Sequence, residues 1–395
     1  MRTCSAVLGV ALALTGCSST VPGTATPGGA LLVLADDVDL GIAYTGGGGR
    51  LEQVALDSSD SPVLLSSTEF VAQAGITRGT DVSTSVPVAA LAEGSPVTAM
   101  AVAPNDTVVM VGNAGVQNRP SVIRVSPDGT ERSYPLALPD VVDPIRVTSS
   151  LGNVGTAFSP HASLVVLTDV PTDDSQGFPV DLGKLQVAVV DTTTGAATEV
   201  VEVQLADPSA DVPGQDPLVR VEDVVMGPDG GVLVAVGLAG QDSRLLRFDA
   251  SLNGVSDVPY ARPADDVGTF LALDDEGTAY LTQTADGVQL LRFAADATEP
   301  EVVATLAEDS TVVRGLAVDP SGTWGYVTAL TDTELGQTVT AVDLATGVQA
   351  PRTSLCDEGF AGPPLLGRSG ETLLVSAQCS DVSTNQEHLY VLRAA

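Results

Sequence analysis

Hydrophobic and polar positions alternate along most of the chain from residue 31 onward, and short polar corners interrupt the alternation at intervals. In one recurring segment an apolar stretch enters a tight corner rich in Pro, Asp and Gly, and a second apolar stretch leaves it. A period of two residues is typical of β-strands, and Pro and Gly supply the fixed and positive φ angles that a chain reversal needs. We therefore expect a hairpin at each copy of this segment, at 99–106, 155–162, 223–230, 270–277, 315–322 and 363–370.

A second recurring segment consists of an apolar stretch, usually an Asp, and a turn of Ser, Thr and Gly. Its copies lie at 54–60, 123–129, 189–195, 246–254, 291–296 and 341–347. Each copy follows a corner of the first kind, except the earliest, and a last apolar stretch at 388–393 ends the chain where a further turn would begin. The pattern therefore predicts two hairpins in each repeat.

Repeats of two hairpins at intervals of roughly 50 residues, with no helical periodicity between them, are typical of the four-stranded blades of a β-propeller. A single hydrophobic core does not extend over so long a chain, whereas neighbouring blades bury their sheets against one another. We therefore predict an all-β chain in which residues 31–395 form a single β-propeller. Seven blades are favoured, and six or eight are left open.

The first blade is the least defined of these. The six corners account for six blades, and a seventh, N-terminal blade would be built from residues 31–35 and 42–44 and the turn at Asp57. Further strand-like sequence lies at 67–95. In the alternative, residues 31–35 supply a missing outer strand of the last blade, which would close the ring and cover a sheet edge.

The N-terminal segment indicates export. Arg2 precedes an apolar run far shorter than the ~20 residues that span a bilayer, and the four residues 14–17 (Leu-Thr-Gly-Cys) then resemble the signal of bacterial lipoproteins. The resemblance implies that residues 1–16 are removed and that Cys17 carries the lipid that holds the protein at the extracytoplasmic face of the cell membrane. Residues 17–30, rich in Pro, Gly and Thr, would form a flexible linker with an r.m.s. reach of about 20 Å. An ordinary secretory signal, cut elsewhere, is the alternative.

Two further cysteines, Cys356 and Cys379, lie within the predicted propeller. An even pair of cysteines in an exported domain favours a disulfide. The alternative, a redox-active pair, usually has the Cys-x-x-Cys spacing, which these residues lack. We therefore predict a structural disulfide.

Composition restricts the chemistry of the chain. With 17 basic and 50 acidic side chains, its formal charge of −33 excludes nucleic acid as a partner, because phosphate contacts would be repulsive. The sequence has neither a phosphate-binding loop nor a nucleophile elbow, and its two histidines, His161 and His388, lack the spacing of zinc ligands. We therefore predict no catalytic residue, no metal ligand and no cofactor.

Calcium is the one cation that remains open. Acidic residues, which are ligands that Ca²⁺ prefers, cluster at 36–39, 173–174, 265–266 and 274–276. The alternative is that these are solvated turn residues. Calcium-dependent assembly would make the Tm rise when Ca²⁺ is added.

One register of the repeats suggests a binding site. Directly before each copy of the first segment, where the innermost strand of a blade begins at the mouth of the channel, the residues are Thr98, Val154, Glu222, Thr269, Arg314 and Gly362. Asp223 adjoins this register, and Asp265 and Asp266 lie just upstream of it. An arginine among acidic residues at a concave mouth predicts a polar-ligand site formed by Glu222, Asp223, Asp265, Asp266 and Arg314. In the alternative, Arg314 pairs with a carboxylate and only ties blades together.

The corner at 319–322 (Asp-Pro-Ser-Gly), followed by Val-Asp-Leu-Ala-Thr-Gly at 342–347, resembles the WD-repeat-like and lactonase-like propellers of bacterial envelopes. The resemblance implies an architecture but transfers no active-site residue, and Trp-Asp dipeptides are absent. We therefore expect a membrane-anchored propeller that binds a protein or a polar ligand without catalysis. The alternative is a lactonase-like or glycosidase-like hydrolase that uses carboxylates at the channel mouth.

Overall fold

The computed structural model describes residues 32–44, 50–67, 74–92, 97–115, 119–138, 156–169, 172–173, 179–180, 183–207, 219–261, 268–285, 287–306, 310–331, 336–380 and 385–394. The predicted signal segment at 1–16, the predicted lipid attachment site Cys17 and the predicted linker at 17–30 lie outside these residues, as do Asp265 and Asp266. Among the described residues, no helix has the length and apolar character needed to cross a membrane.

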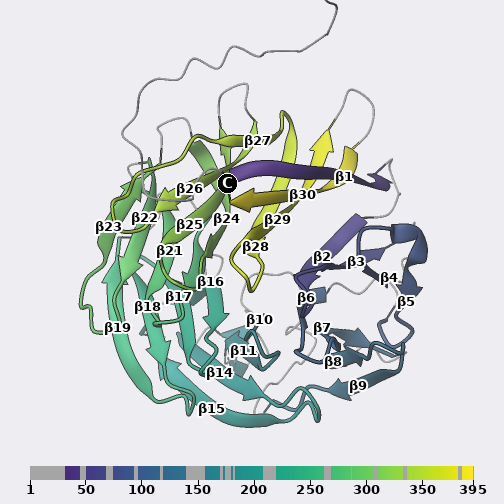
Figure 1. Cartoon of the computed structure of the whole chain (residues 1–395). Helices are drawn as coiled ribbons and strands as arrows, with labels where there is room; N and C mark the ends of the chain where they lie inside the picture. Colours follow the sequence, from purple (N-terminus) through teal and green to yellow (C-terminus); the bar gives the residue numbers. More distant parts are fainter. Residues whose placement is uncertain are drawn as a thin grey trace, which may run out of the picture.

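Within the described residues the strands form seven four-stranded antiparallel sheets, which are arranged as blades in a ring (Figure 1). The fold is therefore a seven-blade β-propeller, which confirms the favoured blade number. A single turn of 3₁₀ helix, η1 (Val82–Thr84), accompanies the strands of this part of the chain.

The first four blades follow the order of the sequence. Blades 1 and 2 consist of β2 (Arg50–Leu56), β3 (Pro62–Ser67), β4 (Ala74–Arg78) and β5 (Val86–Pro87), and of β6 (Val97–Val102), β7 (Val108–Ala114), β8 (Arg119–Val125) and β9 (Glu131–Pro135). Blades 3 and 4 consist of β10 (Thr156–Phe158), β11 (Leu164–Asp169), β14 (Lys184–Val190) and β15 (Ala197–Gln204), and of β16 (Val219–Met226), β17 (Val232–Leu238), β18 (Ser243–Phe248) and β19 (Gly254–Tyr260). A separate two-stranded ribbon between β11 and β14 is formed by β12 (Thr172–Asp173) and β13 (Pro179–Val180).

The last three blades include the one departure from chain order. Blades 5 and 6 consist of β20 (Phe270–Leu273), β21 (Ala279–Ala285), β22 (Gly287–Phe293) and β23 (Glu301–Thr305), and of β24 (Ser310–Val318), β25 (Trp324–Thr331), β26 (Gln337–Asp343) and β27 (Thr353–Cys356). Blade 7 combines the end of the chain with its beginning, in the order β28 (Gly359–Leu366), β29 (Thr372–Ser380), β30 (Asn385–Ala394) and β1 (Leu32–Tyr44).

The strand β1 corrects the expected first blade. It pairs antiparallel with β30, from Leu32 opposite Ala394 to Tyr44 opposite Asn385, so the purple and yellow ends of the chain lie side by side in Figure 1. The described residues of 31–35 and 42–44 therefore do not build blade 1. The alternative that residues 31–35 complete the last blade is confirmed for residues 32–35, and residues 42–44 belong to the same strand. Strand propensity cannot distinguish the two placements, because an outer strand has the same alternation in either blade.

Blade 1 takes its outer strands β4 and β5 from the strand-like sequence after residue 67, and its turn at 57–61 is a seventh corner of the first kind. The prediction that 54–60 was a turn of the second kind is therefore wrong, which explains why this copy had no corner before it.

The corners share one backbone geometry. In every blade the fourth corner residue has a positive φ, and its backbone N–H donates a hydrogen bond to the backbone oxygen of the first corner residue. These residues are Asp60, Asp106, Ala162, Gly230, Gly277, Gly322 and Gly370.

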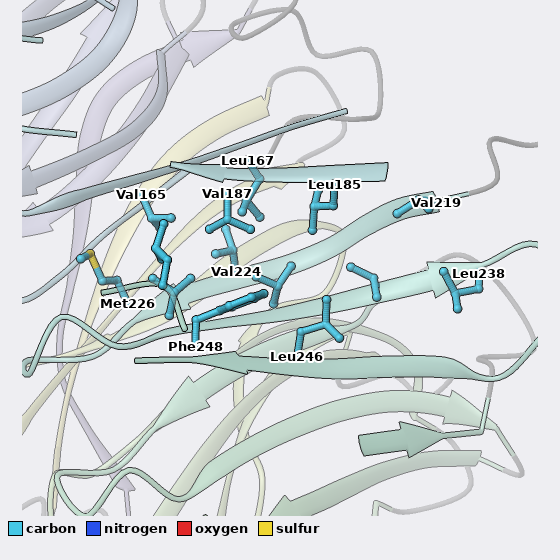
Figure 2. Close-up of a cluster of buried hydrophobic side chains, with 14 residues drawn as sticks. Val165, Leu167, Leu185, Val187, Val219, Val224, Met226, Leu238, Leu246 and Phe248 are labelled. Carbon is cyan, nitrogen blue, oxygen red and sulfur yellow. The ribbon is translucent and has the colours of Figure 1, made fainter. Parts of the chain in front are cut away.

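The hydrophobic core lies between the blades. The second strand of a blade has neighbouring sheets on both of its faces, so all seven positions of β7 and of β17 are buried. Figure 2 shows one such core, in which Val165, Leu167, Leu185 and Val187 of blade 3 face Val224, Leu246 and Phe248 of blade 4. The outermost strand β15, in contrast, has only exposed and half-buried positions.

The predicted disulfide is present between Cys356 and Cys379, whose Cα atoms are 5.8 Å apart. Cys356 ends β27 of blade 6, whereas Cys379 lies on β29 of blade 7. The bond therefore links two neighbouring blades covalently.

Candidate functional site

The register that the sequence singled out coincides with β-bulges in the innermost strands. A bulge adds one residue to a strand and turns its side chain out of the regular alternation, and bulges are common beside functional sites. In blades 1, 2, 4, 6 and 7 the pairing of the innermost strand shifts at this register, and the bulged residues are Glu52, Thr98, Glu222, Arg314, Gly362 and Pro363. The sequence analysis did not include Glu52, because the corner that follows it was interpreted as a turn of the second kind. Thr269 precedes β20, and Val154 lies outside the described residues.

Glu222 is directed into its own blade. Its side chain is 3% exposed, and its Oε1 atom lies 3.2 Å from Nη2 of Arg220. The Tyr260 hydroxyl donates a hydrogen bond of 2.6 Å to Oε2, and burial, followed by the Glu222 charge, raises the pKa of Tyr260 well above its ordinary value, so this donor stays protonated. Gly237 leaves the necessary room, because a Cβ there would be 2.7 Å from Oε1. The Glu222 carboxylate is therefore occupied by protein groups.

Asp223 joins two blades. Its Oδ2 atom accepts a hydrogen bond of 2.7 Å from the backbone N–H of Leu271 in blade 5, and Oδ1 accepts one of 2.8 Å from that of Val224. Burial raises the pKa of Asp223 to about 6, although both hydrogen bonds act in the opposite direction. This carboxyl group therefore links the innermost strands of blades 4 and 5.

The raised pKa of Asp223 predicts a pH effect of definite sign. The folded protein holds this proton more tightly than the unfolded chain, so the Asp223 contribution to stability is largest at low pH and is lost as the pH rises through about 6. In Asp223→Asn this contribution is absent. We therefore expect the free energy of unfolding of the variant, relative to the wild type, to decrease by about 2–3 kcal/mol between pH 7 and pH 4. Urea unfolding of both proteins across this range measures the difference.

Asp249 is the matched control for this experiment. It is an exposed turn residue whose pKa is lowered, chiefly by a side-chain hydrogen bond from Asn253. Its stabilising contribution is lost as the pH falls, so the relative stability of Asp249→Asn should change in the opposite direction. A constant difference between Asp223→Asn and the wild type at every pH would contradict the assignment.

Arg314 differs from the carboxylates of this register. Its guanidinium carbon lies 4.9 Å from the ring centroid of Phe360, which is on the neighbouring innermost strand β28. Its Nε atom is buried and has no hydrogen-bond partner in the part of the chain that the structure describes. Burial lowers the pKa of Arg314, and no carboxylate of the described residues acts against this effect. Among the described residues, Arg314 therefore does not form the blade-tying carboxylate pair that was the alternative.

Several contacts hold Phe360 in place. The side-chain amide of Gln337 in blade 6 donates to the backbone oxygen of Gly359 at 2.9 Å and accepts from the backbone N–H of Ala361 at 3.2 Å. Gly359 has a φ of +132°, and a Cβ at this position would collide with the backbone oxygen of Gln378. Phe360 itself is 59% exposed. The backbone on both sides of Phe360 is therefore held in place, while much of the surface of the ring stays accessible.

The structure thus separates the residues that the sequence grouped together. Arg314 lies against Phe360 between blades 6 and 7, Glu222 is enclosed in blade 4, and Asp223 bridges blades 4 and 5. The sequence analysis missed Phe360, although an aromatic residue near the start of a predicted innermost strand is a usable signal. Gln337 had no such signal, because its partners are distant in sequence.

In the described residues, no group of three or more His, Cys, Asp or Glu side chains is placed to hold a metal ion. Two of the acidic clusters considered for calcium include residues used in local turns: Asp39 accepts from the N–H of Gly41, and Asp274 accepts from those of Glu276 and Thr278. Calcium binding stays an alternative that the sequence leaves open.

No protein-family model matches the sequence, and no curated protein matches it. Among solved structures, the chain is similar to one in the Mitotic Checkpoint Complex (12% identity, 98% of each chain covered, TM-score 0.53). It is also similar to a catalytically inactive virginiamycin B lyase from Staphylococcus aureus with quinupristin (11% identity, 91% of this chain and 98% of that chain, TM-score 0.52). A third similarity is to the Dos1 propeller (12% identity, 90% of this chain and 95% of that chain, TM-score 0.51). At these identities the likeness establishes the fold and not an activity.

Proposed function

We propose that this chain is a lipid-anchored propeller outside the cytoplasm that binds a protein or a polar ligand at the mouth of the ring without catalysis. The observation that carries the proposal is which polar residues at and beside the bulges already have partners within the protein. Glu222 and Asp223 accept hydrogen bonds from protein groups, whereas Arg314 has no carboxylate partner among the described residues and Phe360 is largely exposed. A hydrolase of the kind considered in the sequence analysis needs two carboxylates that can reach a substrate.

The position of β1 supports a particular orientation of the propeller. Leu32, at the start of β1, lies opposite Ala394 at the end of β30, on the side of the blades where the corners lie. A linker from Cys17 would therefore reach the propeller on this side. Phe360 lies near the start of β28, at the opposite end of the strand from its corner. An anchor at Cys17 would thus leave the side that carries Phe360 directed away from the membrane, where a partner could reach it.

The anchor is tested by Cys17→Ser. We expect the wild-type protein to fractionate with membranes and the variant to appear in the soluble extracytoplasmic fraction, because a chain without the acyl groups has no stable membrane attachment. Immunoblots of separated membrane and soluble fractions measure the distribution.

Cys4→Ser is the matched control, because Cys4 lies within the predicted signal segment and not at its end. This variant should fractionate like the wild type. Equal membrane association of Cys17→Ser and the wild type would show that the anchor is wrong.

A further inference from the structure

We propose that Arg314 and Phe360 together bind a small organic acid whose carboxylate is carried on a flat apolar group. The inference rests on the proposed binding role and names the class of ligand for it. It starts from two neighbouring residues of adjacent innermost strands, a guanidinium with an unused donor and a largely exposed aromatic ring.

The hydrogen bonding of Arg314 indicates an anion. A guanidinium has five N–H donors, and removing it from water is costly unless a partner replaces the lost hydrogen bonds. Other arginines of the described chain have such partners: Arg244 lies 2.6 Å from Asp257, and Arg247 donates to the backbone oxygen of Gly277 at 2.6 Å. Arg314 has no carboxylate partner in the described residues, although the chain has 50 acidic side chains.

A carboxylate is the anion that fits this donor best. The planar guanidinium fork matches a carboxylate in a bidentate pair, which makes the hydrogen bonds both stronger and directional. The bulge at Arg314 removes this side chain from the regular alternation of β24. An incoming carboxylate could therefore pair with the guanidinium of Arg314 without displacing a carboxylate of the described residues.

Phe360 specifies the rest of the ligand. An aromatic side chain with 59% exposure carries a large apolar area in contact with water, and burying that area against a flat apolar group is favourable. The guanidinium lies over the same ring, so a carboxylate bound to it and a flat group bound to the ring can belong to one small molecule. The two contacts therefore favour an aromatic acid over a simple inorganic anion.

The two residues are held in place before any ligand arrives. Gly315, next to Arg314, allows β24 and β28 to approach closely, because a Cβ there would collide with Pro363. Gln337 fixes the backbone on both sides of Phe360, and Gly359 pairs with the disulfide-bonded Cys379. A site that is already ordered loses less conformational entropy on binding, which favours measurable affinity for a small ligand.

The test is calorimetric titration of the purified full-length chain with benzoate, acetate and benzamide. The wild type should bind benzoate more tightly than acetate and should not bind benzamide, which has the same ring without the charge. Arg314→Gln should weaken benzoate binding by roughly tenfold or more, and Arg314→Lys by less, since it keeps the charge and loses the fork. Phe360→Leu should reduce benzoate affinity to the level of acetate and leave acetate unchanged.

Arg292→Gln is the matched control, because Arg292 is an outer arginine that lies 2.5 Å from Glu301. It should bind all three compounds as the wild type does. The proposal is overturned if benzoate does not bind, if benzamide binds equally well, or if both Arg314 variants keep wild-type affinity. The fractionation of Cys17→Ser does not depend on this result. A negative titration would therefore rule out the proposed ligand class and would not contradict the proposed anchored binding module.

Discussion

Deletion of residues 32–44 is expected to abolish the cooperative unfolding transition of the protein, because β1 closes the ring. Three of its apolar side chains, Leu32, Leu40 and Ile42, are buried, and their burial contributes roughly 5–8 kcal/mol. A protein of this kind has a total stability of only about 5–15 kcal/mol. Circular dichroism during urea unfolding would show a broad, early loss of structure in place of a single transition.

The closing contacts explain why the effect should spread beyond blade 7. Leu40 and Ile42 pack in one cluster with Leu64 of blade 1 and with Leu374 and Leu389 of blade 7. Without β1, this contact between the first and last blades is lost and the edge of β30 is exposed, which favours association of chains through that edge.

A graded variant and a control accompany the deletion. Leu40→Ala should keep the single transition and lower the free energy of unfolding by about 2–4 kcal/mol, since it removes one buried side chain of β1. Deletion of residues 18–30, which precede β1, should leave the transition unchanged. If the chain lacking 32–44 unfolds as cooperatively as the wild type and at the same urea concentration, β1 does not close the ring.

Replacement of both Cys356 and Cys379 by Ser is expected to lower the free energy of unfolding by about 3 kcal/mol. The disulfide closes a loop with a sequence separation of 23 residues, and cross-linking a loop of this length reduces the entropy of the unfolded chain by about that amount. For a chain of this size the loss corresponds to a decrease in Tm of roughly 4 °C. Differential scanning calorimetry of the variant and the wild type measures the change.

Reduction of the wild type provides the control. Dithiothreitol should lower the Tm of the wild type by a similar amount and should have no effect on the double Ser variant. Because the bond joins β27 of blade 6 to β29 of blade 7, its loss should also be detected as faster hydrogen exchange in these strands. An unchanged Tm in the variant would show that the link contributes nothing to stability.

The fold was largely predictable because its signals are local. The alternation of apolar and polar residues specifies strands, and corner sequences such as Pro104-Asn105-Asp106 specify reversals within a few residues. The error at 54–60 has the same origin: the turn at Asp57 lacks Pro and Gly, so its sequence resembles the second kind of turn. Only its pairing between β2 and β3 identifies it as a corner.

For the candidate site, the sequence predicted only the position along the innermost strands at which its residues lie, and not the contacts that these residues make. Glu222 and Asp223 are adjacent in sequence and were grouped for that reason, but the bulge sends one carboxylate toward Tyr260 and the other toward Leu271. The accessible aromatic partner of Arg314, Phe360, comes from a different blade. Side-chain direction at a bulge depends on which neighbouring groups are within reach, and these belong to other repeats.

The sequence alone therefore determined most strands, six of the seven corners, the repeating blades and the disulfide pair. Strands and corners depend on short-range patterning, and the disulfide depends on two cysteines that lie within the predicted propeller. Tertiary structure decided which blade β1 completes, where the Glu222 carboxylate lies and that Arg314 packs against Phe360 without a carboxylate partner among the described residues. These features depend on contacts between residues that are far apart along the chain, and such contacts exist only once the ring is closed.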